Sequence, residues 1–265
     1  MQAVEAFLRQ NPIFTLSELR TALGDSRSDK TLRNLLAYHE RKGQLVRVDG
    51  VYCVVPPALW GKPFVPDRFL VAAKLRPDAV LAYHTAFELL GFANQVFTTT
   101  YYTSVRYRRP FVHQGVRYVC VRLPERLRRT PFLGVVRAER SGVQVMVTSQ
   151  ERTLVDCLDH PRYAGGFEEA CRCIATLPFV DEEVLWAYLT VRDKAVLFAK
   201  VGWILEQMQG RLFVSDDLLM RLRERAPRHP VMVTRSEHGT THFVARWNLV
   251  VPSAWMEVLE KTTGP

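Results

Sequence analysis

The sequence lacks the features that mark membrane and secreted proteins. It contains no run of about 18 uncharged apolar residues, which excludes a membrane-spanning helix of ordinary length. Its first residues, Met-Gln-Ala-Val-Glu, offer neither the basic start nor the apolar stretch of a signal peptide. We therefore expect a cytoplasmic protein that makes no contact with a membrane.

Cysteine is scarce and scattered, with 5 residues in a chain of 265. An odd number at wide spacing is unlike the disulfide framework of a small secreted domain, so we expect reduced thiols. The Cys171-x-Cys173 pair has no second pair at the spacing of a zinc site, and we interpret it as helix packing. These spacings predict no metal centre and no cofactor.

Sequence signatures of catalysis are also missing. A nucleotidyltransferase needs two carboxylates on one strand, as in Asp-x-Asp, to hold the Mg²⁺ ions that bridge the phosphates. The chain offers only Ser215-Asp216-Asp217, which is typical of a helix N-terminus, and Asp156-x-x-Asp159 at a helix end. We therefore predict no catalytic residues and no enzymatic activity.

The sequence does have an excess of positive charge, and it is concentrated in the middle. Residues 61–145 carry a net charge of +9, against +2 for the residues before them and −2 for those after them. A basic segment attracts phosphates whatever the nucleic-acid sequence, so this distribution indicates a polyanionic partner. The 48% hydrophobic content is typical of a packed globular protein.

The first 60 residues show the order of a winged helix-turn-helix. Apolar residues at helical spacing predict a helix that ends at Asn11-Pro12, and a second helix that starts with a capping box of Thr15 and Glu18. The second helix is expected to turn Leu19, Ala22 and Leu23 inward. A third, longer helix begins at Ser26 or Ser28 and ends at Gly43. Strands at 45–48 and 51–54 flank Asp49-Gly50, which is the signature of a two-residue hairpin turn.

The third predicted helix carries a polar stripe opposite its leucines and His39. The candidate DNA-binding residues are Lys30, Thr31, Arg33, Asn34, Tyr38 and Arg41 on this helix and Arg47 in the hairpin. We expect the helix in the major groove, with Arg33 contacting guanine and Asn34 contacting adenine. Lys30 and Arg41 are better placed for phosphates, and Arg47 for the flanking backbone or the minor groove. A merely solvated helix, or a protein–protein module, is the alternative interpretation.

Residues 61–265 show strands, then helices, then strands, which is typical of an α+β domain. Runs of β-branched and aromatic residues, or of alternating polarity, predict strands at 95–103, 116–123 and 143–147. Helical spacing predicts helices at 151–158, 167–175, 182–189, 194–208 and 216–224. A last hairpin is expected to pair 231–234 with 242–249.

Two arginine clusters account for much of the basic middle segment. A predicted strand at 102–108 puts Arg106 and Arg108 on one face with Tyr102 and Ser104, and Arg109 follows. The second cluster, on a predicted loop, consists of Arg126, Arg128 and Arg129. These six arginines are a candidate second polyanion-binding surface, serving flanking operator DNA or an RNA or nucleotide. Ordinary solvated surface is the alternative.

Six segments of the chain match a known family together. They are Gly-Val-Tyr-Cys-Val-Val-Pro-Pro at 50–57, Asp-Arg-Phe-Leu-Val-Ala-Ala-Lys-Leu at 67–75, Tyr-His-Thr-Ala-Phe-Glu-Leu-Leu-Gly at 83–91, Thr-Ser-Gln-Glu-Arg-Thr-Leu-Val-Asp at 148–156, Tyr-Ala-Gly-Gly-Phe-Glu-Glu at 163–169 and Arg-Trp-Asn-Leu-Val-Val-Pro at 246–252. With these segments the chain resembles the AbiEi antitoxins of type IV toxin–antitoxin systems, which act in abortive infection. The segments follow the family's order over most of the chain. No base contact is carried over, because the recognition helix varies within that family.

The resemblance implies a repressor that binds inverted repeats in its own promoter and an antitoxin, in residues 61–265, that counteracts a nucleotidyltransferase toxin without a stable complex. Two other functions remain open. One is a winged-helix transcription factor with a ligand-sensing domain and no toxin. The other is a nuclease or nucleotidyltransferase that a winged helix targets to DNA, for which the chain lacks the expected carboxylate cluster.

Overall fold

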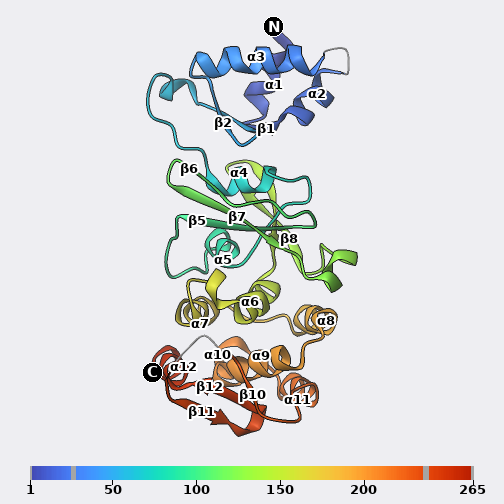
Figure 1. Cartoon of the computed structure of the whole chain (residues 1–265), viewed down its shortest axis with the longest axis vertical. Helices are drawn as coiled ribbons and strands as arrows, with labels where there is room; N and C mark the ends of the chain where they lie inside the picture. Colours follow the sequence, from blue (N-terminus) through green and yellow to red (C-terminus); the bar gives the residue numbers. More distant parts are fainter. Residues whose placement is uncertain (1, 25–27, 235–238, 264–265) are drawn as a thin grey trace.

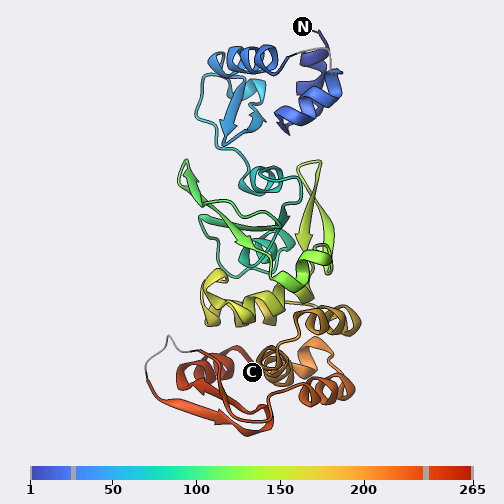
Figure 2. The same ribbon diagram turned by 45° about the vertical axis from the view of Figure 1, so that its right-hand side comes forward.

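The computed structural model describes residues 2–24, 28–234 and 239–263, which form a stack of layers along one long axis (Figure 1). A winged helix lies at one end and a six-stranded sheet follows it. A layer of helices comes next, and a small sheet with the last helices lies at the other end. The same stacking is visible after rotation about the vertical axis (Figure 2).

The winged helix has the predicted three helices and hairpin. Its elements are α1 (Gln2–Gln10), β1 (Ile13–Thr15), α2 (Leu16–Leu23), α3 (Asp29–Arg41), β2 (Leu45–Val48) and β3 (Val51–Val54). The capping box of Thr15 and Glu18 is present. Asp49 and Gly50 take the positive φ angles, 48° and 91°, that a tight hairpin turn requires. Ser28 caps α3, whereas Ser26 lies outside the described residues.

Two details of the winged helix differ from the expectation. Ala22 is exposed rather than inward. In addition, residues 13–15 form the strand β1, which pairs with β3 and gives the sheet the order β1-β3-β2. Three residues are too few for a periodic pattern, so only the pairing with the hairpin reveals this strand.

The middle layer is a mixed sheet with the strand order β6-β7-β5-β4-β9-β8. Its elements, with the linker turn that precedes them, are η1 (Pro57–Leu59), α4 (Arg68–Lys74), β4 (Val80–Leu81), α5 (His84–Leu90), β5 (Thr99–Ser104), β6 (Phe111–His113), β7 (Val116–Arg122), η2 (Glu125–Arg129), β8 (Val135–Arg140) and β9 (Val143–Thr148). Helix α4 covers the face toward the winged helix, and α5 covers the face toward the helical layer (Figure 1).

The remaining chain is mainly helical. Its elements are α6 (Gln150–Asp159), η3 (Pro161–Tyr163), α7 (Phe167–Ala175), α8 (Glu182–Arg192), α9 (Ala195–Gln207), α10 (Gln209–Leu212), α11 (Asp216–Glu224), β10 (Val231–Met232), β11 (Thr241–Val244), η4 (Ala245–Trp247), β12 (Leu249–Pro252) and α12 (Ser253–Thr263). Helices α7 and α11 have the predicted bounds, and α6, α8 and α9 differ from theirs by one to three residues at an end. The predicted α+β class is confirmed.

Two predictions about strands and one about a loop are wrong. Strand β5 ends at Ser104, so Arg106 and Arg108 lie on no strand and share no face with the buried Tyr102. The arginines at 126–129 lie on the 3₁₀ helix η2 rather than in a loop. No hairpin joins β10 to β11, because β12 lies between them and pairs with β10 in parallel and with β11 antiparallel.

Candidate nucleic-acid interface

Helix α3 is fixed to the winged helix by its apolar side and by its first turn. Leu32 and Leu36 are fully buried against α1, α2 and the sheet. The Ser28 hydroxyl accepts a hydrogen bond from the Thr31 amide at 3.2 Å, which satisfies one of the free N–H groups of the first turn. An ion pair between Arg20 and Asp29 links α2 to α3. The outward face of α3 is therefore held on a rigid support.

The residues of α3 that were predicted to read DNA lie on its outward face. Those on α3 are exposed: Lys30, Thr31, Arg33, Asn34, Tyr38 and Arg41. The Arg33 side chain is 64% exposed and lies 3.6 Å from Asp29, a loose pair that leaves its guanidinium available. The Lys42 ammonium lies 4.6 Å from the centre of the Tyr38 ring. Helix α3 runs along the outer end of the molecule, away from the other layers (Figures 1 and 2).

Arg47 extends the basic surface from α3 onto the hairpin. It is exposed, and its guanidinium lies 5.7 Å from the centre of the Tyr52 ring. Burial raises the pKa of Tyr52, and the positive charges of Arg47 and Arg33 oppose that shift. Arg47 lies opposite Tyr52 in the register of β2 and β3, and Tyr52 packs in the core that contains Leu32 and Leu36, so Arg47 lies on the side of the hairpin that faces α3.

The other face of the winged-helix sheet packs on the middle layer. Ile13, Val48, Val51 and Cys53 share a core with the α4 residues Phe69 and Leu70. An ion pair joins Glu18 to Lys74. Burial raises the pKa of Glu18, but hydrogen bonds from Lys74 and Thr15 outweigh it and hold the pKa below its ordinary value. The winged helix is therefore docked on α4 through both an apolar face and a charged contact.

The candidate second surface divides into paired and unpaired arginines. Arg108 forms an ion pair with Asp49 at the tip of the hairpin, and only 21% of its side chain is exposed. Arg126 pairs with Asp193 at 2.7 Å. Within the described part of the chain, no ion pair is found for four exposed arginines, Arg106, Arg109, Arg128 and Arg129. The contact of Arg108 with the hairpin joins residues 59 positions apart, and the sequence contains no signal for it.

The carboxylates weighed as catalytic candidates have structural partners. Asp156 accepts a hydrogen bond from the Tyr188 hydroxyl at 2.6 Å and pairs with Arg192. Asp159 pairs with Arg192 and with Lys194. Burial raises the pKa of Asp159, but Arg192 and the other cations outweigh it and lower that pKa. Ser215 caps α11 as predicted. Asp156 and Asp159 are thus engaged in the packing of α6 against α8.

A hollow of about 590 Å³ lies beside the C-terminal end of α3. It is lined by Glu5, Leu8, Arg9, Pro12, His39, Gln44, Val54, Val55, Pro56, Pro57 and Trp60. His39, on the apolar side of the predicted helix, is half-buried, and its Nδ1 atom lies 2.7 Å from Gln44 Oε1.

The described residues were also compared with the requirements of a membrane-spanning helix. None of their helices is long and apolar enough to cross a membrane.

Comparisons with known proteins support the interpretation of the N-terminal part. None of the curated proteins matches the chain. The whole fold is similar to the crystal structure of the RV2827C protein from Mycobacterium tuberculosis, with a TM-score of 0.64 at 17% sequence identity, covering 100% of this chain and 94% of that one. This likeness concerns the fold alone. Residues 1–55 match the family of the AbiEi antitoxin transcriptional regulators, which confirms the resemblance predicted from the sequence for the winged helix.

Proposed function

We propose that the protein represses its own operon by binding inverted repeats in the promoter, and that it is the antitoxin of a nucleotidyltransferase-like toxin. The observation that carries the proposal is the outward face of α3. It combines exposed basic and amide side chains, it lies at the free end of the molecule, and it falls within the residues that match a family of antitoxin transcriptional regulators.

Helix α3 supplies the groups that sequence-specific DNA binding requires. The guanidinium of Arg33 suits the O6 and N7 acceptors of guanine, and the amide of Asn34 suits adenine. Lys30 and Arg41 flank these residues and carry charge for the phosphates, which fix the register of a protein on DNA. Arg47 serves the adjacent backbone or minor groove. A solvated helix would not discriminate between DNA sequences.

Replacing Arg33 or Asn34 with alanine is expected to weaken binding to the native promoter by about 1–3 kcal/mol, because a bidentate base contact is lost. Lys30→Ala is expected to lower the affinity for the native promoter and for scrambled DNA equally, because a phosphate contact carries no sequence information. Fluorescence anisotropy with both DNAs at near-physiological salt measures the two effects.

The matched control is Arg172→Ala, an exposed arginine on α7 that pairs with Glu168. It removes one positive charge from the molecule without touching α3 and should leave both affinities unchanged. Equal binding of the unmodified protein to native and scrambled promoter would show that it is no sequence-specific repressor.

The antitoxin part of the proposal concerns residues 61–265, where we assign the second polyanion-binding surface to the four unpaired arginines. We propose that they contact flanking operator DNA or an RNA or nucleotide on which the toxin acts. Counteraction of the toxin then requires no stable complex between the two proteins, since both engage the same polyanion.

Converting Arg106, Arg109, Arg128 and Arg129 together to glutamine separates the two roles. If the surface touches duplex DNA, each lost phosphate contact flattens the log–log dependence of operator binding on salt by about 0.9. If it serves antitoxicity, the variant binds the operator normally but no longer rescues cells that express the toxin. No change in either measurement, in a variant with the melting temperature of the unmodified protein, would assign the segment to solvated surface.

The hollow beside α3 favours a second candidate, a ligand-responsive regulator without a toxin. Its lining is mostly apolar, it holds enough volume for a small organic molecule, and it borders the end of the DNA-reading helix. The neighbouring reading frame discriminates between the candidates. A nucleotidyltransferase-like gene next door supports the antitoxin, and its absence supports the ligand-responsive regulator.

A further inference from the structure

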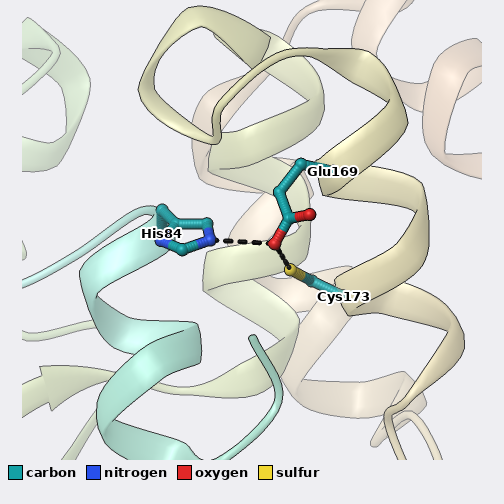
Figure 3. Close-up of side chains that lie close together, drawn as sticks. All are labelled: His84, Glu169 and Cys173. Atoms are coloured by element: carbon teal, nitrogen blue, oxygen red, sulfur yellow. Dashed lines mark hydrogen bonds and ion pairs between the residues drawn. The ribbon is translucent and has the colours of Figure 1, made fainter. Parts of the chain in front are cut away.

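Three side chains from two separate helices meet in the interior between the sheet and the helical layer (Figure 3). His84 begins α5, and Glu169 and Cys173 lie one turn apart on α7. His84 Nε2 lies 3.0 Å from Glu169 Oε1, and Cys173 Sγ lies 3.3 Å from the same oxygen. All three residues are buried, with exposed fractions of 1%, 3% and 0%. We call them the His84–Glu169–Cys173 cluster.

The surroundings of the cluster orient His84. Its other ring nitrogen, Nδ1, lies 3.0 Å from Glu88 Oε1, and Glu88 is in turn paired with Arg68. The ring of Phe97 lies 4.2 Å from the imidazole, centre to centre. Metal-bound histidines in proteins almost always donate their second ring N–H to a carboxylate or carbonyl in this way. Nε2 is thereby directed at Glu169 and Cys173.

We propose that the His84–Glu169–Cys173 cluster is a binding site for a divalent ion of the zinc class. An imidazole nitrogen, a carboxylate oxygen and a thiolate sulfur are the ligand types of Zn²⁺, with bonds of about 2.0–2.3 Å. The three atoms lie within 4.8 Å of one another, close to the span that two such bonds allow. The fourth position of a tetrahedral site is left to the second oxygen of Glu169 or to a water molecule.

The charges around the cluster suit a divalent cation. The two ring nitrogens of His84 face two carboxylates, Glu88 on one side and Glu169 on the other, and Arg68 pairs with Glu88. A cation bound at Nε2 would therefore lie beside the buried carboxylate of Glu169, so its charge would not be left without a counter-charge. On binding, the Cys173 thiol would release its proton to solvent, because the thiolate is the form that binds a metal.

The cluster also has a route to solvent and a structural consequence. The Gln95 amide donates to Glu169 Oε1 at 2.9 Å, and Asn94, Gln95 and Val96 are exposed, so one loop separates the ligands from water.

A bound ion would join α5, under the sheet, to α7, in the helical layer. It lies far from α3 along the molecule, so the expected effect is on stability rather than on DNA recognition (Figure 1).

The test uses the full chain loaded with Co²⁺ or Zn²⁺ after treatment with a chelator. We expect one bound ion per chain and, for Co²⁺, the visible absorption of a tetrahedral site with a thiolate charge-transfer band. Zn²⁺ at saturation should raise the melting temperature by roughly 10 °C, because an ion that binds only the folded state stabilises it. Cys173→Ser should abolish the thiolate band and lower the affinity at least tenfold.

Cys171→Ser is the matched control, since Cys171 is equally buried on the same helix but lies outside the cluster. It should keep both the band and the stoichiometry. If Cys173→Ser does not fold, the metal content and the cobalt–thiolate band of the unmodified protein and of Cys171→Ser still test the proposal. Absence of bound metal and of the cobalt–thiolate band in the folded, unmodified protein would overturn the proposal and leave a purely hydrogen-bonded cluster. Retention of the band in Cys173→Ser would likewise overturn it.

Discussion

Replacing Asp156 with alanine is expected to destabilise the fold by about 3–5 kcal/mol, because it removes the carboxylate that pairs with the buried Arg152 and leaves Arg192 with only Asp159 as a counter-charge. Arg152 and Arg192 have side chains only 0% and 2% exposed, and both are oriented toward Asp156. Tyr188 loses its hydrogen-bond acceptor as well. The carboxylate therefore connects α6 to α8, and its loss should separate these helices.

Denaturant unfolding monitored by circular dichroism measures this loss, which corresponds to a fall in melting temperature of roughly 6–20 °C. Glu168→Ala is the matched control. Its carboxylate is 57% exposed and pairs with Arg172 one turn away, an arrangement that contributes less than about 1 kcal/mol. Equal effects of the two substitutions would contradict the buried ion-pair interpretation.

Trp247→Ala is expected to lower the free energy of unfolding by about 3–5 kcal/mol, because it leaves a cavity in a fully packed part of the core. Trp247 is completely buried, and its indole N–H donates to Glu206 at 2.7 Å. Its ring lies against Gly202 of α9 so closely that a Cβ at that position would be 2.1 Å from the ring. The tryptophan thus holds the small C-terminal sheet on α9.

Trp60→Ala provides the comparison, since Trp60 is 47% exposed and leaves no buried cavity when truncated. Trp60→Ala should lower the free energy of unfolding by well under half as much as Trp247→Ala. The loss comes mainly from the hydrogen bond that the Trp60 indole donates to the Val55 carbonyl. Thermal unfolding of both variants measures the two losses of stability. A mild effect at Trp247 would mean that the C-terminal sheet is not anchored through this side chain.

These contacts give a physical role to segments that resemble the AbiEi family. In residues 148–156, Ser149 caps α6, Glu151 accepts a hydrogen bond from the Asp181 amide at 3.1 Å, and Arg152 donates to the carbonyls of Pro131 and Leu133. Asp156 completes the segment with its arginine pair. Glu151 and Asp156 connect α6 to the start and the end of α8, and Arg152 connects it to the segment that precedes β8. The segment therefore maintains the packing between layers, and its charged residues are not evidence of catalysis.

The winged helix and most helices could be predicted from the sequence because their signals are local. The capping box at Thr15, the Asp49-Gly50 turn and the apolar spacing of α3 each involve residues a few positions apart. The bounds of α7 and α11 follow from the same rules. The exposed polar face of α3 could be predicted for the same reason, since helical geometry alone places Arg33 and Asn34 opposite Leu32 and Leu36.

Only the tertiary structure decided which distant segments meet. The strand order of the six-stranded sheet, the position of β12 between β10 and β11, and the pairing of β1 with β3 depend on long-range contacts that no local pattern encodes. The same holds for Arg108, which pairs with the hairpin instead of facing a ligand, and for His84, which meets Glu169 from 85 positions away. Sequence spacing records neighbours along the chain, whereas burial and charge pairing are satisfied by whichever partners the packing of layers brings together.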